Sequence, residues 1–178
     1  MISRAAELDP VSQAILKDKG MAFYYNRHYN EAIELATKTL ELDPTYAAAH
    51  RLLSLAYQGK GLFDEAIAEN QKWEEITGNK IEAAVSLAQL YAVSGRTEEA
   101  RTLIDGLQRD KPVMDQIYRG LALVHAALGD NELAFKCLES SYARREEAIL
   151  TLKVDPKVDP LRVDPRFMVL LRKIGIEK

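Results

Sequence analysis

The repeating unit of this chain is written most fully at residues 47–80, AAAHRLLSLAYQGKGLFDEAIAENQKWEEITGNK. An alanine from its middle recurs every 34 residues, as Ala32, Ala66, Ala100 and Ala134. Other columns keep this interval: the glycines Gly61, Gly95 and Gly129; the small residues Gly20, Ser54, Ala88 and Ala122; the rings Phe23, Tyr57, Tyr91 and His125; and Pro10, Pro44 and Pro112, with Gly78 at the missing step. Five columns with one period indicate an internal structural repeat.

Each unit reads as a pair of helices. The apolar residues of 13–26 and of 30–42 recur with helical spacing. A glycine between the two helices can adopt the left-handed conformation that ends a helix. In the first unit Arg27 occupies this place, and we expect Asn26 and Asn30 to form the turn instead. The small residues predict close crossings, and the unit is therefore predicted to be a helical hairpin.

Asp-Pro steps separate successive hairpins, at Asp9-Pro10 and Asp43-Pro44. Proline disfavours helical geometry in the residue before it, so the preceding helix must end there. Aspartate is expected to cap the next helix, with proline in its first turn.

The pattern resembles the tetratricopeptide repeat, whose landmarks W-x2-L-G-x2-Y, A and P are matched in part. Leu53, Ser54, Tyr57 and Ala66 carry the match in the second unit, and Leu16, His50, Ala84 and Tyr118 replace the signature tryptophan. The resemblance implies an all-α, right-handed α-α superhelix of antiparallel hairpins with a C-terminal capping helix. We expect a second helix of a partial repeat at 1–12, four repeats at 13–46, 47–80, 81–114 and 115–148, and Asp-Pro turns with the capping helix at 149–178.

The two ends depart from the repeat. Residues 2–8 read as the second helix of a preceding repeat, so the chain is either a fragment or a short chain with an improvised cap. Residues 146–153 are expected to form a helix, followed by three Val-Asp-Pro turns. A last helix is expected from Pro165, capped by Asp164 and closed by Gly175. This tail is similar to the tails of repeat regions in large bacterial signalling proteins that carry kinase, nucleotide-cyclase or winged-helix modules.

Composition excludes several classes of function. The chain has 24 basic and 27 acidic residues, so no net positive field favours nucleic acid. No apolar run is long enough to span a bilayer, and the N-terminus lacks a signal-peptide core. We expect no membrane contact from this chain and a cytoplasmic location, or a periplasmic one if an anchor lies upstream. The single Cys137 excludes an internal disulfide and is expected to be a small buried residue.

No catalytic constellation is present in the sequence, which predicts a protein that is not an enzyme and holds no cofactor or metal. Gly59-Lys60-Gly61 lacks the spacing of a phosphate loop. The three histidines fall in different units without ligands nearby. His125 is expected to pack in the core with one hydrogen bond satisfied, and His50 to replace a bulky core residue.

The first helix of each hairpin is expected to line a concave groove for a protein or peptide. The expected groove residues are Lys17, Met21, Tyr24, Tyr25, Arg51, Leu52, Leu55, Gln58, Glu82, Val85, Ser86, Gln89, Gln116, Arg119 and Leu123. Some family members hold a peptide's terminal carboxylate with a lysine–asparagine clamp. Only Lys17 matches that clamp here, and Glu82 would repel a carboxylate.

Two functions remain open at this point. One is a non-catalytic scaffold that binds a peptide or protein in the groove. The alternative is a self-associating or ligand-sensing regulatory region of a larger bacterial signalling enzyme or transcription regulator.

Overall fold

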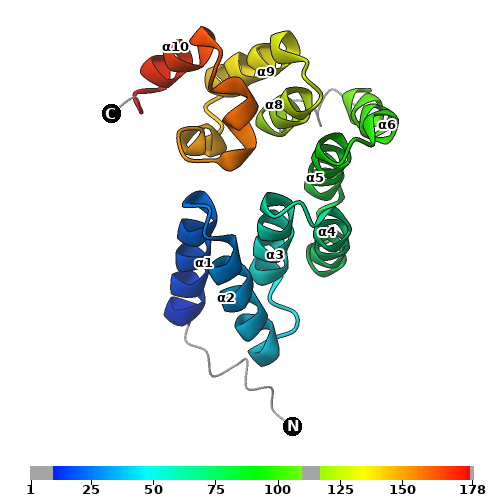
Figure 1. Cartoon of the computed structure of the whole chain (residues 1–178), viewed down its shortest axis with the longest axis vertical. Helices are drawn as coiled ribbons and strands as arrows, with labels where there is room; N and C mark the ends of the chain where they lie inside the picture. The colour runs from blue at the N-terminus through cyan, green and yellow to red at the C-terminus, as the bar shows by residue number, and fades with distance from the viewer. Residues whose placement is uncertain (1–9, 110–116, 177–178) are drawn as a thin grey trace. The chain divides into compact units, whose positions relative to one another are not determined.

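The computed structural model describes residues 10–109 and 117–176, and all regular secondary structure in these ranges is helical (Figure 1). The chain divides into two compact units, Met1–Asn79 and Lys80–Lys178. The predicted all-α fold of antiparallel hairpins is confirmed within each unit. Residues 2–8, which we expected to form a helix, lie outside the described ranges.

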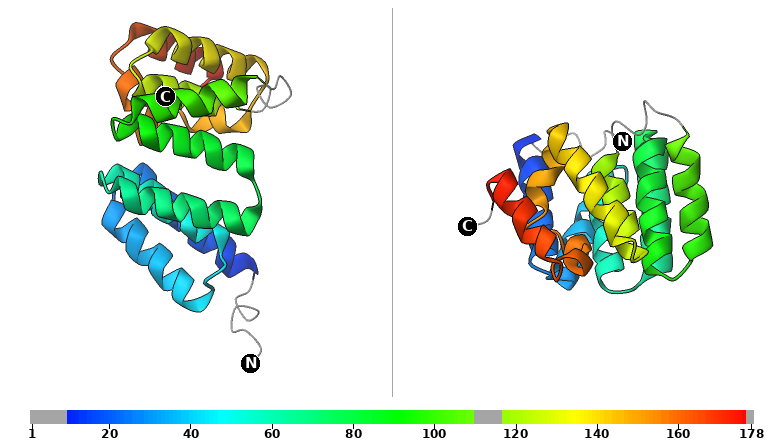
Figure 2. Two further views of the ribbon diagram at one scale, coloured as in Figure 1. Left: turned by 90° about the vertical axis from the view of Figure 1, so that its right-hand side faces the viewer. Right: turned by 90° about the horizontal axis from the view of Figure 1, so that it is seen from above.

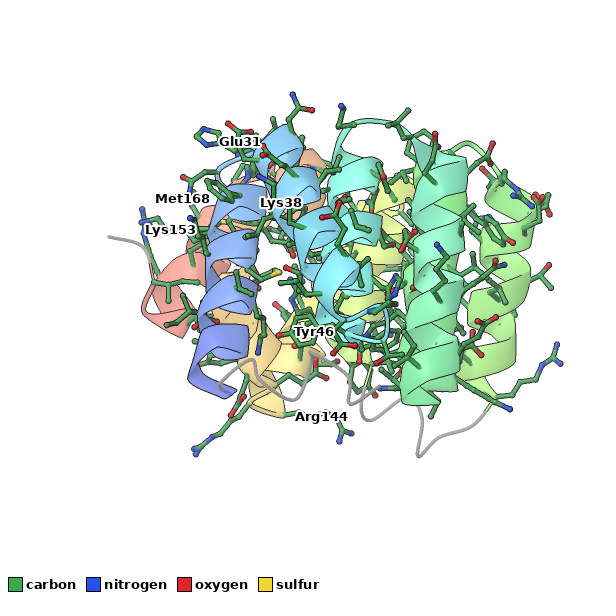
Figure 3. The ribbon with its side chains drawn as sticks, turned by 90° about the horizontal axis from the view of Figure 1, so that it is seen from below. Glu31, Lys38, Tyr46, Arg144, Lys153 and Met168 are labelled. Carbon is green, nitrogen blue, oxygen red and sulfur yellow. The ribbon has the colours of Figure 1, made fainter. Side chains whose placement is uncertain are left out.

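The first unit contains two hairpins, and its helices run as follows: α1 (Pro10–Tyr25), α2 (Tyr29–Leu42), α3 (Ala47–Gly59) and α4 (Phe63–Thr77). Helix α1 packs on α2, α3 packs on α4, and α2 and α1 both contact α3. The exposed side of α2 carries charged side chains such as Glu31 and Lys38 (Figure 3). Because α3 contacts both helices of the first hairpin, the two hairpins share one core.

The second unit also contains two hairpins, followed by the C-terminal segment: α5 (Lys80–Val93), α6 (Thr97–Gln108), α8 (Tyr118–Ala127), α9 (Asn131–Ala143), the 3₁₀ helices η2 (Glu147–Thr151) and η3 (Pro156–Leu161), and α10 (Pro165–Ile174). Helix α5 packs on α6 and α8, and α8 packs on α9. The hairpin pairing can be followed in Figures 1 and 2.

Small residues allow the helices of each hairpin to cross closely, as the repeat predicts. The alanine column is fully buried at Ala32, Ala66, Ala100 and Ala134. In the second hairpin the Ser54 hydroxyl donates a 2.8 Å hydrogen bond to the Ala66 carbonyl, which links the two small columns directly. A larger side chain at either position would separate the helices.

The turns follow the prediction at the glycines and depart from it in the first unit. Gly61, Gly95 and Gly129 have positive φ angles. Arg27 itself adopts a φ of 60°, although we expected the neighbouring asparagines to make this turn. Asn26 assists by donating a side-chain hydrogen bond to the Ala22 carbonyl.

The Asp-Pro steps behave in two ways. Asp43 ends α2, and its carboxylate accepts hydrogen bonds from Thr45, while α3 begins only at Ala47. The expected cap on α3 is therefore wrong, because the turn around Pro44 comes before the helix. Asp164 does cap α10 as predicted, with Pro165 in the first turn and Gly175 at the end. Asp9 lies outside the described residues.

The C-terminal segment is more helical than predicted. The first part, expected to be a helix, contains the 3₁₀ helix η2. The middle part, expected to be turns, forms η3, with Asp155 as its N-cap, Pro156 in its first turn and Pro160 inside it. Proline is compatible with the first turn of a helix, where its missing N–H has no partner to lose.

Candidate functional site

The predicted groove residues of the first unit separate into buried and accessible ones. Tyr24 and Leu52 are only 2% and 4% exposed, so the expectation that they face a partner is wrong. Tyr24 packs against Tyr29, with ring centroids 6.1 Å apart. Leu52 fills the space over Gly20, where an added Cβ would come within 2.3 Å of its Cδ2.

Five of the remaining residues lie on the contacting helices α1 and α3, and we define them as the α1–α3 patch: Lys17, Met21, Tyr25, Arg51 and Leu55. Met21, Tyr25 and Leu55 are half-buried and pack against the same core cluster. Lys17 is exposed and Arg51 is half-buried. The patch thus combines apolar side chains with two cations. Gln58, also half-buried, lies one turn beyond Leu55 on α3.

Arg51 is held in place by the first unit's own core. Its guanidinium lies over the ring of Trp73, 5.1 Å from the ring centroid. Such stacking is a cation–π interaction and limits the rotamers of the long side chain. Trp73 is itself only 8% exposed, so it is a fixed platform.

A buried polar pair lies beneath α3 and α4. His50 Nε2 donates to the Pro44 carbonyl at 3.0 Å, and Nδ1 lies 2.6 Å from the Glu69 carboxylate. Lys72 donates to the other oxygen of Glu69 at 2.8 Å. His50 therefore fills a core position, as expected, and its ring also ties the α2–α3 turn to α4.

In the second unit the predicted groove residues are mostly inside. Val85, Gln89 and Leu123 are 7%, 3% and 3% exposed, so the expectation that they contact a partner is also wrong. Val85 packs where α5 meets α8, since an added Cβ at Gly120 would lie 2.4 Å from its Cγ1. Glu82 and Ser86 are half-buried on α5, and Gln116 lies outside the described residues.

Arg119 is used inside the chain, which corrects the prediction that it binds a partner. Its guanidinium donates to the carboxylate of Asp155, the N-cap of η3, and at 3.0 Å to the Thr151 hydroxyl. The Arg119 side chain is only 15% exposed and that of Asp155 only 4%. The sequence pattern did not predict this pair, because the two residues lie 36 positions apart and do not belong to the same repeat.

The charge environment of Asp155 keeps it ionised. Burial by itself raises its pKa, but the charges of Lys157 and Arg119 and hydrogen bonds from both residues leave the pKa below its ordinary value. Its other oxygen accepts the Lys157 backbone N–H at 3.0 Å. The carboxylate is thus both a helix cap and an ion-pair partner.

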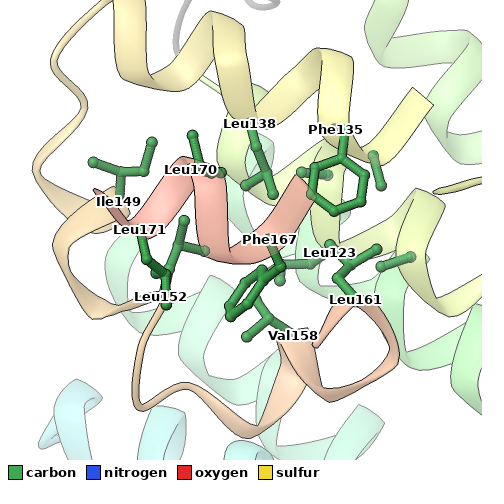
Figure 4. Close-up of a cluster of buried hydrophobic side chains, with 13 residues drawn as sticks. Leu123, Phe135, Leu138, Ile149, Leu152, Val158, Leu161, Phe167, Leu170 and Leu171 are labelled. Atoms are coloured by element: carbon green, nitrogen blue, oxygen red, sulfur yellow. The ribbon is translucent and has the colours of Figure 1, made fainter. Parts of the chain in front are cut away.

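Apolar side chains complete the contact between the C-terminal segment and α8. Leu123 belongs to a buried cluster with Val158 and Leu161 of η3, and with Phe167 of α10 (Figure 4). Leu152, Val158 and Leu161 are fully buried. The segment therefore covers the face of α8 that the sequence assigned to a partner.

Glu146 fixes the start of this segment. Its carboxylate accepts the Arg119 backbone N–H at 3.1 Å and the Ser141 hydroxyl at 2.8 Å. A carboxylate near the N-terminus of α8 is favoured by the unpaired N–H groups and the helix dipole.

A hollow of about 600 Å³ lies between α6, α8 and α9. His125 lines it and is 4% exposed, with Nδ1 3.8 Å from the Asp130 carboxylate, too long for a hydrogen bond. The Nδ1 atom has no hydrogen-bond partner among the described residues, while the ring packs in the core as expected. Burial lowers the pKa of His125. Burial also raises the pKa of the half-buried Cys137 thiol to about 11, which disfavours the reactive thiolate.

Comparison with protein families assigns this architecture. The model of the tetratricopeptide repeat matches residues 17–80 and 85–148. The chain belongs to the tetratricopeptide repeat family. Tetratricopeptide repeats generally mediate protein–protein interactions and are typically non-catalytic scaffolds.

Two features are absent from the part of the chain that the structure describes. Within residues 10–109 and 117–176, no three His, Cys, Asp or Glu side chains are grouped so that they could hold a metal ion. None of the described helices is both long and apolar enough to cross a membrane. The candidate site that these residues form is the α1–α3 patch, which combines apolar side chains with two cations.

Proposed function

We propose that this chain is a non-catalytic scaffold that binds a peptide or segment of a partner protein on the α1–α3 patch. The observation that carries the proposal is that Met21, Tyr25 and Leu55 are half-buried and pack against one core cluster, while Lys17 and Arg51 lie on the same two helices. Apolar contacts bordered by charged groups suit an extended or helical peptide, in which the charges select the partner and its register.

The second unit supplies an internal comparison that supports this proposal. On α8 the residues at the corresponding repeat positions, Arg119 and Leu123, hold a segment of the chain itself. This face of a first helix can therefore receive a short polypeptide through one ion pair and a few aliphatic contacts.

Site-specific photo-crosslinking tests the proposal. A benzophenone amino acid replaces Leu55 in the patch or, as the matched control, Lys38 on the exposed side of α2. We expect a crosslinked partner from position 55 and not from position 38. The product should be lost when Met21→Arg is added, while circular dichroism shows an unchanged helical signal. Equal crosslinking from both positions, or none from position 55, would rule out the patch.

The resemblance of the tail to bacterial signalling proteins supports a further part of the proposal, that the array is a regulatory docking region. A kinase, nucleotide-cyclase or winged-helix module encoded in the same reading frame would support this context. A reading frame that joins the array to an unrelated module would count against it.

A further inference from the structure

The C-terminal segment shows which chemistry fits the first helix of a hairpin in this chain. Asp155, Val158 and Leu161 are spaced three residues apart along η3. A 3₁₀ helix has three residues per turn, so these side chains lie on one face. Asp155 meets Arg119, while Val158 and Leu161 share a buried cluster with Leu123. The docked face therefore reads as a carboxylate followed by two aliphatic side chains.

The receiving side of this contact recurs in the first unit. Arg119 and Leu123 correspond, 68 residues earlier, to Arg51 and Leu55 on α3. One repeat further back, Lys17 and Met21 keep the same chemistry on α1: a cation followed four residues later by an apolar side chain. Residues four apart are neighbours on one face of an α-helix.

The third repeat breaks the pattern, which makes the correspondence informative. Its residues at these positions are Val85 and Gln89, and both are buried. A cation with an aliphatic neighbour is therefore not a general requirement of the hairpin. It is found on α8, where a segment is docked, and on α1 and α3, where the side chains form the α1–α3 patch.

We propose that the α1–α3 patch recognises a partner segment of the same chemistry as Asp155–Leu161: a carboxylate followed at the third and sixth positions by aliphatic residues in a short helical turn. The carboxylate pairs with Arg51, and the aliphatic side chains contact Leu55 and Met21. Stacking on Trp73 presets the guanidinium, which lowers the cost of ordering it on binding. This proposal rests on the proposed scaffold function and adds the class of partner.

The chain's own sequence supplies the probe. A blocked peptide of residues 154–162, VDPKVDPLR, is titrated into the full chain, and emission from Trp73, the only tryptophan, is followed. The covalently attached segment already occupies α8, and its high effective concentration resists displacement by the free peptide. We expect a saturable change in emission, because the binding site includes the cation stacked on the indole.

Matched peptides test the carboxylate. The peptide with Asp155→Asn should bind about tenfold more weakly, since it loses a charge-assisted hydrogen bond. The peptide with Asp159→Asn keeps the same net charge as that variant and should change affinity by less than about twofold. Equal weakening by both peptides would overturn the proposed register.

A double-mutant cycle identifies the partner of that carboxylate. Arg51→Gln in the protein should also weaken binding about tenfold, and Arg51→Gln with the Asp155→Asn peptide should show little further loss, because the two changes remove one interaction. Additive losses, or the absence of binding by the unmodified peptide, would overturn the inference. If crosslinking at position 55 still captures a partner in that case, the scaffold function stands and only the partner class is wrong.

Discussion

At the scale of single residues, the ion pair between Arg119 and Asp155 determines how the second unit ends. A buried pair is worth little relative to apolar side chains, but removing one member leaves the other charge buried without compensation. Both side chains are at least 85% buried. The same guanidinium that sequence reasoning assigned to a partner is therefore part of the fold.

We expect Asp155→Asn to destabilise the second unit by about 3 kcal/mol at neutral pH, because Arg119 then loses its buried counter-charge. The pKa of Asp155 is lower in the folded chain than in the unfolded one. Its contribution to the stability of the folded chain is therefore complete above the unfolded pKa of about 3.9. That contribution declines as the pH falls through the folded pKa. Urea unfolding at neutral pH and near pH 3 measures both effects.

The control for this prediction is Asp159→Asn in the same helix. Asp159 pairs with Arg162 at the surface, where an ion pair contributes at most about 1 kcal/mol. Equal destabilisation by the two variants would contradict the role assigned to Asp155. So would a difference in unfolding free energy between wild type and Asp155→Asn that is as large near pH 3 as at neutral pH.

At the scale of elements, each hairpin depends on residues without side chains at the points where first helices meet. Gly20 on α1 faces Leu52 on α3, and Gly120 on α8 faces Val85 on α5. In both places an added Cβ would come within 2.4 Å of the neighbouring side chain. The two contacts differ in how easily the neighbour can move.

We expect Gly120→Ala to destabilise the chain by about 1–3 kcal/mol, because the branched Val85 side chain is stiff and cannot turn away from the new methyl group. Gly20→Ala should change stability by less than about 1 kcal/mol, since the Leu52 terminus can rotate and alanine favours the helix. Thermal unfolding followed by circular dichroism compares the two variants.

A second substitution at Val85, made in the Gly120→Ala variant, is the control for this comparison. Val85→Ala should restore part of the stability lost in Gly120→Ala, because it empties the space that the new methyl group requires. If the double variant loses more stability than the two single variants lose together, steric overlap is not the cause.

At the scale of the whole molecule, the C-terminal segment completes the core of the second unit. A repeat array exposes the apolar face of its last hairpin, and a capping element has to cover it. Here Phe167, Leu170 and Leu171 of α10 lie in one buried cluster with Phe135 and Leu138 of α9 (Figure 4). The segment is therefore a structural part of the unit.

We expect Leu161→Ala to destabilise the second unit by about 2–4 kcal/mol, because the side chain is fully buried and its removal leaves a cavity. Val163→Ala, two residues later, should cost less than about 0.5 kcal/mol, because Val163 is 88% exposed. Urea unfolding of the two variants checks this. Similar small losses in both would mean that the segment is not part of the core.

The sequence by itself determined the hairpin array, since the 34-residue period of small residues, glycines and rings reflects local helix geometry and close crossings. It also determined the cap of α10, because Asp-Pro and a closing glycine act within a few residues. Only the tertiary structure decided which first-helix residues remain accessible. Periodicity placed Arg119 and Leu123 beside Arg51 and Leu55 in one class, but a segment more than 30 residues later covers the α8 pair. That contact depends on side-chain burial and charge pairing between distant parts of the chain, which no local pattern of this sequence encodes.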